Sequence, residues 1–336
     1  MHIDEGPPPV TMSDVAKRAG VSRALVSIVF RGVPGASPAN RERVMRAAEE
    51  LSYRRDEHAR LLRSSRSRTI GVVFGLHHEF HAQLVESLYR AADTADYDLA
   101  LGAVSPARGE QRAVQSLIDH RCEALILIGS LLPRQDIEEL AARRPVVTMA
   151  RALRSPAVDV VRTDDVAGAR LAVEHLIGLG HRRIVHVHGG RSPGAAERRK
   201  GYNHAMRAAK LESEMRLIQG GLTEEDGERA AEQILSEDPP TAVLAFNDHC
   251  AAGLQATARK RGVQVPDRLS IVGYDDSHIA GLSSVALTTI GQDARALAHH
   301  AIDRAAAWAD RTIDQATEIV VPPHLVQRHS AAQLAP

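Results

Sequence analysis

Short apolar runs alternate with amphipathic stretches over most of the chain, from Thr69 onward. The runs are continuous and bounded by glycine or proline, which is typical of buried strands, whereas the stretches between them repeat apolar residues as helices do. The expected strands cover residues 70–75, 97–102, 123–129, 145–150, 158–163, 182–190, 241–246 and 269–274. The expected helices include residues 82–94, 111–120, 167–179, 195–209, 224–236 and 250–261. Because alternating strands and helices form parallel sheets covered on both faces, the pattern predicts an α/β fold with enough strands for two sheets.

Residues 11–53 show a different pattern, of three short helices with polar caps. Ser13 is expected to cap a helix that ends at Gly20, and Ser22 a second helix that follows directly. Ser37, with a proline after it, is expected to cap the third. Two short helices joined by a turn that contains glycine predict a helix-turn-helix.

Charge separates these two parts of the chain, although its 336 residues balance 42 Lys and Arg against 42 Asp and Glu. Residues 1–68 hold 13 Lys and Arg against 8 Asp and Glu, a net charge of +5, which leaves 29 against 34, or −5, for the rest. A basic segment on an acidic body predicts contact with nucleic acid through that segment alone.

The cysteines and the apolar segments of the chain indicate where in the cell the protein is expected. Cys122 and Cys250 are too few for a disulfide framework, which favours a reducing, cytoplasmic location. Residues 1–10 carry acids and prolines where a secretory signal needs basic residues and an apolar run, so we expect a disordered leader. A membrane-spanning helix needs about 18 consecutive apolar residues, and no apolar stretch of the chain approaches that length, so we expect no membrane partner.

Motifs of enzyme chemistry are scarce. No G-x-G-x-x-G loop joins a strand to a helix, and neither the phosphate loop G-x-x-x-x-G-K-[ST] nor H-E-x-x-H occurs. We therefore expect no catalytic residue, no cofactor and no metal. His77, His78 and His81 with Glu79 leave a metal site open as an alternative, because histidines at such spacing share a helix face.

A set of motifs runs in a fixed order along nearly the whole chain. It begins with TMSDVAKRAGVSRALVSIVFRG and SPANRERVMRAAEELSYRRDEHARLLR, and continues with GARLAVEHLIGLGHRRIVHVHGG, TAVLAFNDHCAAG and VPDRLSIVGYDDS. In order and spacing these motifs resemble the LacI/GalR family of bacterial transcription regulators. The resemblance implies a helix-turn-helix DNA-binding head at residues 11–53, a hinge at 54–68, and a two-lobed, periplasmic-binding-protein-like (type I) effector and dimerisation domain at 69–336. The N-lobe would comprise about 69–165 and 291–319, and the C-lobe about 166–290 and 320–332.

In such a head the second helix enters the major groove and its N-terminal residues read base edges. That assigns base readout to Arg23, Ala24 and Ile28, and backbone contact and support to Ser13, Ser22, Ser27 and Arg31. Arg23 can donate two hydrogen bonds to a guanine, whereas Ala24 and Ile28 can contact only apolar groups such as the thymine methyl. Leu25 and Ile28 stand where the family usually has threonine and arginine, so we expect an operator that differs from the family's usual one.

The resemblance also implies a hinge helix that forms when two copies meet on DNA. Leu62 would insert into the minor groove and kink the duplex, with Ala59 at the contact between the two helices. Arg55 and Asp56 replace the Pro-Asn pair usual in the family. An ordinary flexible basic linker remains the alternative.

Polar residues at strand ends mark the expected effector site, because ligands of open α/β sheets bind at the carboxyl ends of strands. The site residues expected from this placement and from the resemblance are Glu79, Phe80, His81, Arg198, Asn247, Asp275 and Gln292. Carboxylates and an amide, helped by an arginine, are suited to hold the vicinal hydroxyls of a sugar. For the neighbouring Asp248 and Asp276 a capping role is the favoured alternative.

Two substitutions bear on the effector's identity. Leu222 and Ala150 occupy positions where members of the family often carry tryptophan and aspartate, and aromatic residues make up only 3% of the chain. The alternatives for the effector are therefore an unusual sugar, or a non-sugar such as a nucleoside or a cationic metabolite.

Together these features predict a sequence-specific DNA-binding regulator, a repressor, that binds a palindromic double-stranded operator as a homodimer and is switched by a small-molecule effector. The main alternative is a solute-binding protein of a transport system, which would need a secretory signal in place of the helix-turn-helix. A sugar-modifying enzyme would need an acid/base pair or a cofactor loop.

Overall fold

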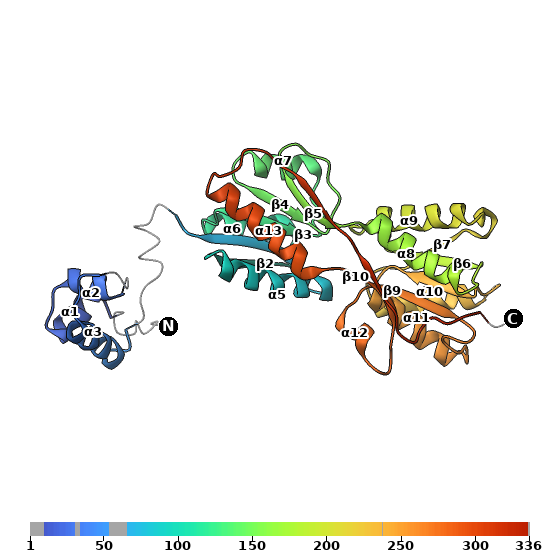
Figure 1. Cartoon of the computed structure of the whole chain (residues 1–336), viewed down its shortest axis with the longest axis horizontal. Helices are drawn as coiled ribbons and strands as arrows, with labels where there is room; N and C mark the ends of the chain where they lie inside the picture. The colour runs from blue at the N-terminus through green and yellow to red at the C-terminus, as the bar shows by residue number, and fades with distance from the viewer. Residues whose placement is uncertain (1–9, 31–33, 54–65, 237, 335–336) are drawn as a thin grey trace, which may run out of the picture. The chain divides into compact units, whose positions relative to one another are not determined.

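The computed structural model describes residues 10–30, 34–53, 66–236 and 238–334, and the chain divides into two compact units, 1–67 and 68–336. The smaller unit consists of α1 (Met12–Ala19), α2 (Arg23–Phe30) and α3 (Pro38–Glu50) (Figure 1). Its core is formed by Val15, Ala16, Ala19, Val26, Val29, Val44, Ala47 and Ala48, all buried. The apolar positions of all three helices therefore meet at one centre, as a helix-turn-helix bundle requires.

The caps of these helices agree with the sequence prediction at two of three places. Ser22 accepts a hydrogen bond from the Leu25 N–H at 3.2 Å, and Ser37 accepts one from the Asn40 N–H at 3.3 Å. The prediction for Ser13 was wrong, because Thr11 caps α1. The Thr11 hydroxyl accepts from the Asp14 N–H at 3.4 Å, and the Asp14 carboxylate accepts from the Thr11 N–H at 2.8 Å. This reciprocal pair is a capping box, and it leaves Ser13 exposed in the first turn.

The larger unit holds two six-stranded sheets, and we call each sheet with its helices a lobe (Figure 1). The N-lobe sheet is parallel throughout, in the order β11-β5-β4-β3-β1-β2. Its strands are β1 (Thr69–Gly75), β2 (Asp98–Val104), β3 (Ala124–Ile128), β4 (Val146–Met149), β5 (Asp159–Thr163) and β11 (Glu318–Val321). Helices α5 (Glu79–Thr94) and α13 (Ala294–Ala309) pack on one face, and α6 (Glu110–Asp119) and α7 (Arg134–Ala141) on the other.

The C-lobe repeats this plan with the order β12-β10-β9-β8-β6-β7, in which only β12 runs antiparallel to its neighbour. Its strands are β6 (Ile184–His188), β7 (Arg216–Gln219), β8 (Ala242–Ala245), β9 (Ser270–Asp275), β10 (Thr288–Gly291) and β12 (His324–Val326). Helices α8 (Asp165–Gly178) and α9 (Ala195–Ala208) pack on one face, and α10 (Glu224–Ser236), α11 (Asp248–Lys260) and the short α12 (His278–Gly281) on the other. A 3₁₀ turn, η1 (Glu212–Glu214), precedes β7.

The chain passes between the two lobes three times, after β5, after β10 and after β11. The third passage follows Val321, which still pairs with Thr163 in the N-lobe sheet, so the expected boundary at 319/320 lies two residues too early. Parallel strands bring the polar residues at their carboxyl ends to one edge of each sheet. None of the described helices combines the length and the apolar character needed to cross a lipid bilayer.

Candidate functional site

A cavity in the larger unit is lined by residues of both lobes. All seven residues expected to meet an effector lie along it: Glu79, Phe80, His81, Arg198, Asn247, Asp275 and Gln292. The N-lobe contributes the loop after β1 and the start of α5, and the C-lobe contributes α9 and the ends of β8 and β9. The structure thus brings together residues that are far apart in sequence, and their contact with a ligand stays a prediction.

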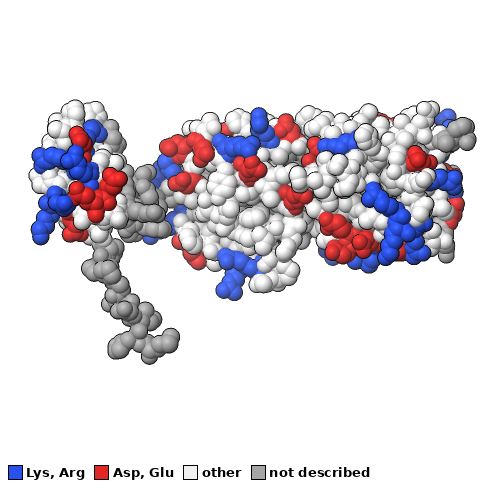
Figure 2. All heavy atoms as spheres, turned by 90° about the horizontal axis from the view of Figure 1, so that it is seen from below, with Lys and Arg blue, Asp and Glu red and all other residues white. Residues whose placement is uncertain are grey.

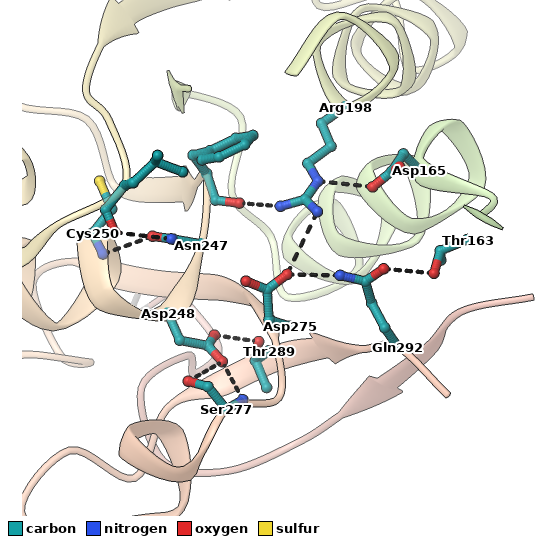
Figure 3. A network of polar contacts seen from close by, with 12 residues as sticks. Thr163, Asp165, Arg198, Asn247, Asp248, Cys250, Asp275, Ser277, Thr289 and Gln292 are labelled. Carbon is teal, nitrogen blue, oxygen red and sulfur yellow. Dashed lines mark hydrogen bonds and ion pairs between the residues drawn. The ribbon is translucent and has the colours of Figure 1, made fainter. Parts of the chain in front are cut away.

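Arg198 on α9 is the central cation of the cavity (Figure 3). Its Nε donates to Oδ1 of Asp165 at 2.8 Å, and its two terminal nitrogens donate to the Phe246 carbonyl at 2.6 Å and to Asp275 at 3.5 Å. The side chain is only 8% exposed. Burial disfavours its charge, but the two carboxylates outweigh burial and raise the pKa of Arg198. The guanidinium is therefore permanently charged and already neutralised by protein acids.

Asp275 ends β9 in a left-handed conformation with φ +107°, which directs its carboxylate to the edge where the lobes meet. Burial raises the pKa of this carboxyl to about 6, while Arg198 and a hydrogen bond from Gln292 oppose the rise. Gln292 donates to Oδ1 of Asp275 at 2.8 Å and accepts from the Thr163 hydroxyl at 2.5 Å. A carboxylate with one engaged oxygen remains able to accept a hydrogen bond from a ligand.

Asn247 has a structural role that the sequence analysis assigned mainly to its neighbours. Its Oδ1 accepts from the Cys250 N–H at 2.9 Å and caps α11, and its Nδ2 donates to the Leu222 carbonyl at 3.0 Å. Both ends of the amide are thus engaged within the protein, although the residue lines the cavity. Helix capping alone accounts for an asparagine at this position.

Asp248 and Asp276 are held by the protein in ways other than the expected capping. Asp248 is fully buried and accepts hydrogen bonds from the Thr289 hydroxyl at 2.5 Å and from the N–H and hydroxyl of Ser277 at 2.7 and 3.0 Å (Figure 3). Burial and then Asp275 raise the pKa of Asp248 to about 7, against these hydrogen bonds. Asp276 pairs with Arg328 at 2.7 Å.

The first turn of α5 supplies a neutral histidine and an aromatic ring. Nδ1 of His81 accepts a hydrogen bond from the Gly75 N–H at 3.0 Å, which places the ring proton on Nε2. Burial, and then His78, lower the pKa of His81 to about 3, so the ring is an uncharged donor. Phe80 lines the cavity and also packs into the N-lobe core, with 8% of its surface exposed.

His249 is a cavity residue that sequence reasoning missed. It lies in the first turn of α11, where Nδ1 is 2.7 Å from Oε1 of Glu224 and Nε2 is 2.8 Å from Oε2 of Glu79. Phe246 and Ser192 also line the cavity without having been predicted. Their position after β8 and β6 was the available signal, since the same strand-end rule selected Asn247 and Asp275.

The segment between β6 and α9 carries a motif that was not predicted from the sequence. Residues 190–194 read G-R-S-P-G and follow a strand and open a helix, which is the context of a G-x-S-x-G nucleophile elbow. Among the described residues, however, no hydrogen bond joins the Ser192 hydroxyl to a histidine or a carboxylate. The motif therefore lacks the base that would activate a serine.

The metal alternative finds no support in the described parts of the chain, where no three histidine, cysteine or acidic side chains converge as metal ligands do. His81 uses Nδ1 for the Gly75 N–H, and Glu79 uses both oxygens, for His249 and for the His278 N–H at 2.7 Å. His81 and Glu79, two of the four side chains of the proposed cluster, are thus engaged with the protein.

The residues expected to read DNA are placed on α2 of the smaller unit. Arg23 and Ala24 are exposed at its N-terminus, whereas Ile28 and Ser27 are half-buried. Within the described residues the Arg23 guanidinium has neither a hydrogen bond nor an ion pair, so it can donate to a partner. Arg31, Ala59 and Leu62 lie outside the described residues.

Comparison with known proteins adds independent information. Residues 11–56 match the family model described as bacterial regulatory proteins, lacI family, and residues 173–331 match a periplasmic binding protein-like domain. The chain is 34% identical to the HTH-type transcriptional regulator GalR of Escherichia coli (strain K12) over 329 residues, which cover 96% of each chain. It is also similar to a LacI transcriptional regulator from a Rhodococcus species (TM-score 0.78, 44% identity, 80% of this chain and 100% of the other). A third similar structure is the lac repressor dimer bound to operator and the anti-inducer ONPF (TM-score 0.84, 29% identity, 98% and 100%).

Proposed function

This chain is a transcriptional regulator of the LacI family, and from that premise we propose that it is a cytoplasmic repressor that binds a palindromic operator as a homodimer and is switched by a small molecule in the cavity between its lobes. The observation that carries the proposal is that one chain contains both a helix-turn-helix unit and a two-lobed unit with a cavity. Helix α2 presents Arg23, whose guanidinium has no partner among the described residues. It is followed in the chain by a two-lobed unit whose cavity gathers polar residues from both lobes.

The head supports specific DNA binding through α2. In a helix-turn-helix the second helix lies in the major groove, and the exposed Arg23 at its N-terminus can pair with guanine O6 and N7. Ser22 caps the same helix, which fixes the backbone from which Arg23 and Ala24 project. Two copies on a two-fold axis would read two half-sites, as implied by the lac repressor dimer on its operator.

Leu62 and Ala59 keep the roles predicted for the hinge: Leu62 as a minor-groove wedge and Ala59 at the contact between two hinge helices. An apolar wedge unstacks a base step, so it favours sequences that kink easily. On the face of the larger unit shown in Figure 2, acidic and basic groups are interspersed, so this face offers DNA no continuous basic surface.

The charges of the cavity favour an uncharged, hydroxylated effector over a phosphorylated or carboxylated one. Arg198 is the one arginine along the described cavity wall, no lysine lines it, and Asp165 and Asp275 already neutralise that arginine. An anion would therefore meet a surplus of carboxylates. Phe80 and Phe246 offer apolar faces, while Asp275 and His81 offer an acceptor and a donor for hydroxyl groups.

The ligand can switch operator binding only if its affinity differs between two arrangements of the lobes. A ligand that binds one arrangement of the lobes better than another shifts the population toward it, and operator affinity changes if the head and hinge engage DNA in only one arrangement.

The proposal is tested by selecting duplexes from a random library with the full chain at one fixed salt concentration. We expect a shared palindromic sequence among the bound duplexes. A thermal-shift screen then compares sugars and nucleosides with their phosphates. An uncharged member should stabilise the protein, by about 2.7 kcal/mol at 100 times its Kd, and change affinity for the selected duplex. Recovery of duplexes without a shared sequence would contradict operator binding.

A further inference from the structure

One chain of polar contacts crosses between the lobes at the cavity, and it involves no residue that the proposed function assigns to DNA binding. Glu79 is the first residue of α5 in the N-lobe, while His249 and Glu224 lie in the first turns of α11 and α10 in the C-lobe. The imidazole of His249 stands between the two carboxylates, 2.8 Å from Glu79 and 2.7 Å from Glu224. Of these two contacts, the one with Glu79 joins the lobes, whereas the one with Glu224 lies within the C-lobe.

The two contacts constrain where the protons lie, provided that both carboxylates are ionised. A carboxylate oxygen that is ionised accepts hydrogen bonds and donates none, so both ring nitrogens of His249 must donate, and only imidazolium has two N–H groups. The other oxygen of Glu79 accepts a hydrogen bond from the His278 N–H at 2.7 Å. Both carboxylates also lie at helix N-termini, where negative charge is favoured.

The two carboxylates offset two unfavourable surroundings of the imidazolium. His249 itself lies at the N-terminus of α11, where positive charge is disfavoured, and its side chain is only 28% exposed. Burial lowers the pKa of His249, but the hydrogen bonds and charges of Glu224 and Glu79 outweigh it, so the pKa lies above the ordinary histidine value of 6.5.

Two further titratable groups face His249. His78 comes from the loop before α5, where burial, His77 and His249 each lower its pKa. Asp275 comes from the end of β9 in the C-lobe, where the charge of His249 opposes the upward shift caused by burial. Neither group is hydrogen-bonded to the His249 ring among the described residues.

We propose that Glu79, His249 and Glu224 form a proton-dependent latch that holds the two lobes together at the effector cavity. Loss of one proton leaves the ring a single N–H for two carboxylates. Glu224 belongs to the same lobe as His249 and keeps its contact when the lobes separate, so the bond to Glu79 is the one that is lost. The His278 N–H still binds Glu79, and the latch weakens without disappearing. Lobe closure is therefore favoured below the pKa of His249 and declines as the pH rises through it.

The test measures lobe separation in the full chain without ligand or DNA. Nitroxide labels on Arg112→Cys in α6 and Lys260→Cys in α11, both exposed positions, report the distance between lobes by pulsed electron paramagnetic resonance. The native Cys122 and Cys250 are buried, and a sample without the two new cysteines controls for their labelling. In the otherwise unchanged protein we expect a longer-distance population to grow as the pH is raised from below the ordinary histidine pKa of 6.5 to well above it.

Three variants decide whether His249 is the cause. His249→Gln and Glu79→Gln should both abolish the pH dependence, the second without changing the residue that titrates. Glu228→Gln removes an exposed carboxylate from α10 without contact to His249 and should leave the response intact. If either His249→Gln or Glu79→Gln fails to fold, the remaining variant still tests the latch. The titration of His249 can also be followed directly by ¹H–¹⁵N correlation spectroscopy, and its midpoint pH should be lower in Glu79→Gln than in the parent protein.

A distance distribution that does not change with pH in the parent protein would overturn the latch. A response that survives in His249→Gln would also overturn it, and would assign the effect to Asp275 or Asp248. The regulatory meaning of the latch rests on the proposed effector site, but its measurement uses neither operator nor effector. Failure of the latch therefore leaves the duplex selection unaffected, and failure of that selection leaves the latch intact.

Discussion

Nε2 of Gln292 donates a hydrogen bond of 2.8 Å to Oδ1 of Asp275. Gln292 follows β10 where the chain returns to the N-lobe, and Asp275 ends β9 in the C-lobe. The carbonyl oxygen of the same amide accepts from Thr163 at the end of β5. One side chain thus connects the carboxyl ends of strands from both sheets, next to two of the three passages between lobes.

Gln292→Ala should destabilise the larger unit by about 1–3 kcal/mol, because it leaves a buried carboxylate with fewer donors. The measurement is urea unfolding followed by circular dichroism. Gln233→Ala, an exposed glutamine on α10, is the matched control and should change the unfolding free energy by less than about 0.5 kcal/mol. Equal effects of the two substitutions would show that the amide contributes nothing specific.

The sequence was informative where a feature is local. β3 reads as an unbroken apolar run and all five of its residues are buried, so its prediction required no knowledge of its partners. By contrast β11 and β12 have four and three residues with mixed exposure, too little signal to distinguish them from loops. Their placement depends on pairing with β5 and β10, from which they are separated in sequence, and no local pattern contains that information.

The residues of the candidate site likewise differ in how far the sequence could predict them. Asn247 and Asp275 were predictable because parallel strands present their carboxyl ends at one edge. The role of His249 was not predictable, because it depends on a contact with Glu79, which lies 170 positions away in sequence and on the other lobe. Asn247 also shows the limit of the rule, since a polar residue after a strand caps the next helix as readily as it binds a ligand.

Asp248 should make the stability of the larger unit depend on pH. Its pKa is raised from 3.8 to about 7, chiefly by burial, so between these values the folded chain retains a proton that the unfolded chain has released. The free energy of unfolding therefore falls as the pH rises through this window. Asp248→Asn, which carries no charge at any pH, should flatten that decline when unfolding midpoints are compared at several pH values.

The control for this series is Asp93→Asn on α5, an exposed acid without a side-chain ion pair among the described residues, for which no change in the slope is expected. Asp275 contributes in the same direction, since burial also raises its pKa, to about 6, so Asp248→Asn should reduce the pH dependence without removing it. A slope in Asp248→Asn equal to that of the parent protein would mean that the buried carboxyl titrates normally.

The capping box at α1 involves Thr11, whereas the sequence prediction had assigned the cap to Ser13. Thr11→Ala removes the acceptor for the Asp14 N–H and should lower the stability of the head by about 0.5–2 kcal/mol. Ser13→Ala should change it little, because Ser13 makes no capping bond. The head is a separate compact unit, so calorimetry of the full chain can follow its transition. A larger loss for Ser13→Ala than for Thr11→Ala would contradict the observed cap.

Arg23 provides the sharpest test of base readout. Its guanidinium is exposed at the N-terminus of α2, and a bidentate contact to guanine contributes about 1–3 kcal/mol of discrimination. Arg23→Ala should therefore relax the preference at one base pair of each half-site and leave the others unchanged, as measured by duplex selection at a single salt concentration. Arg46→Ala is the control, because Arg46 lies on α3 and pairs with Glu42, so its loss should not alter the base preference. If the selected sequences from Arg23→Ala matched those of the parent protein, Arg23 would act on the phosphate backbone, and specificity would have to come from Ala24, Ile28 or the shape of the duplex.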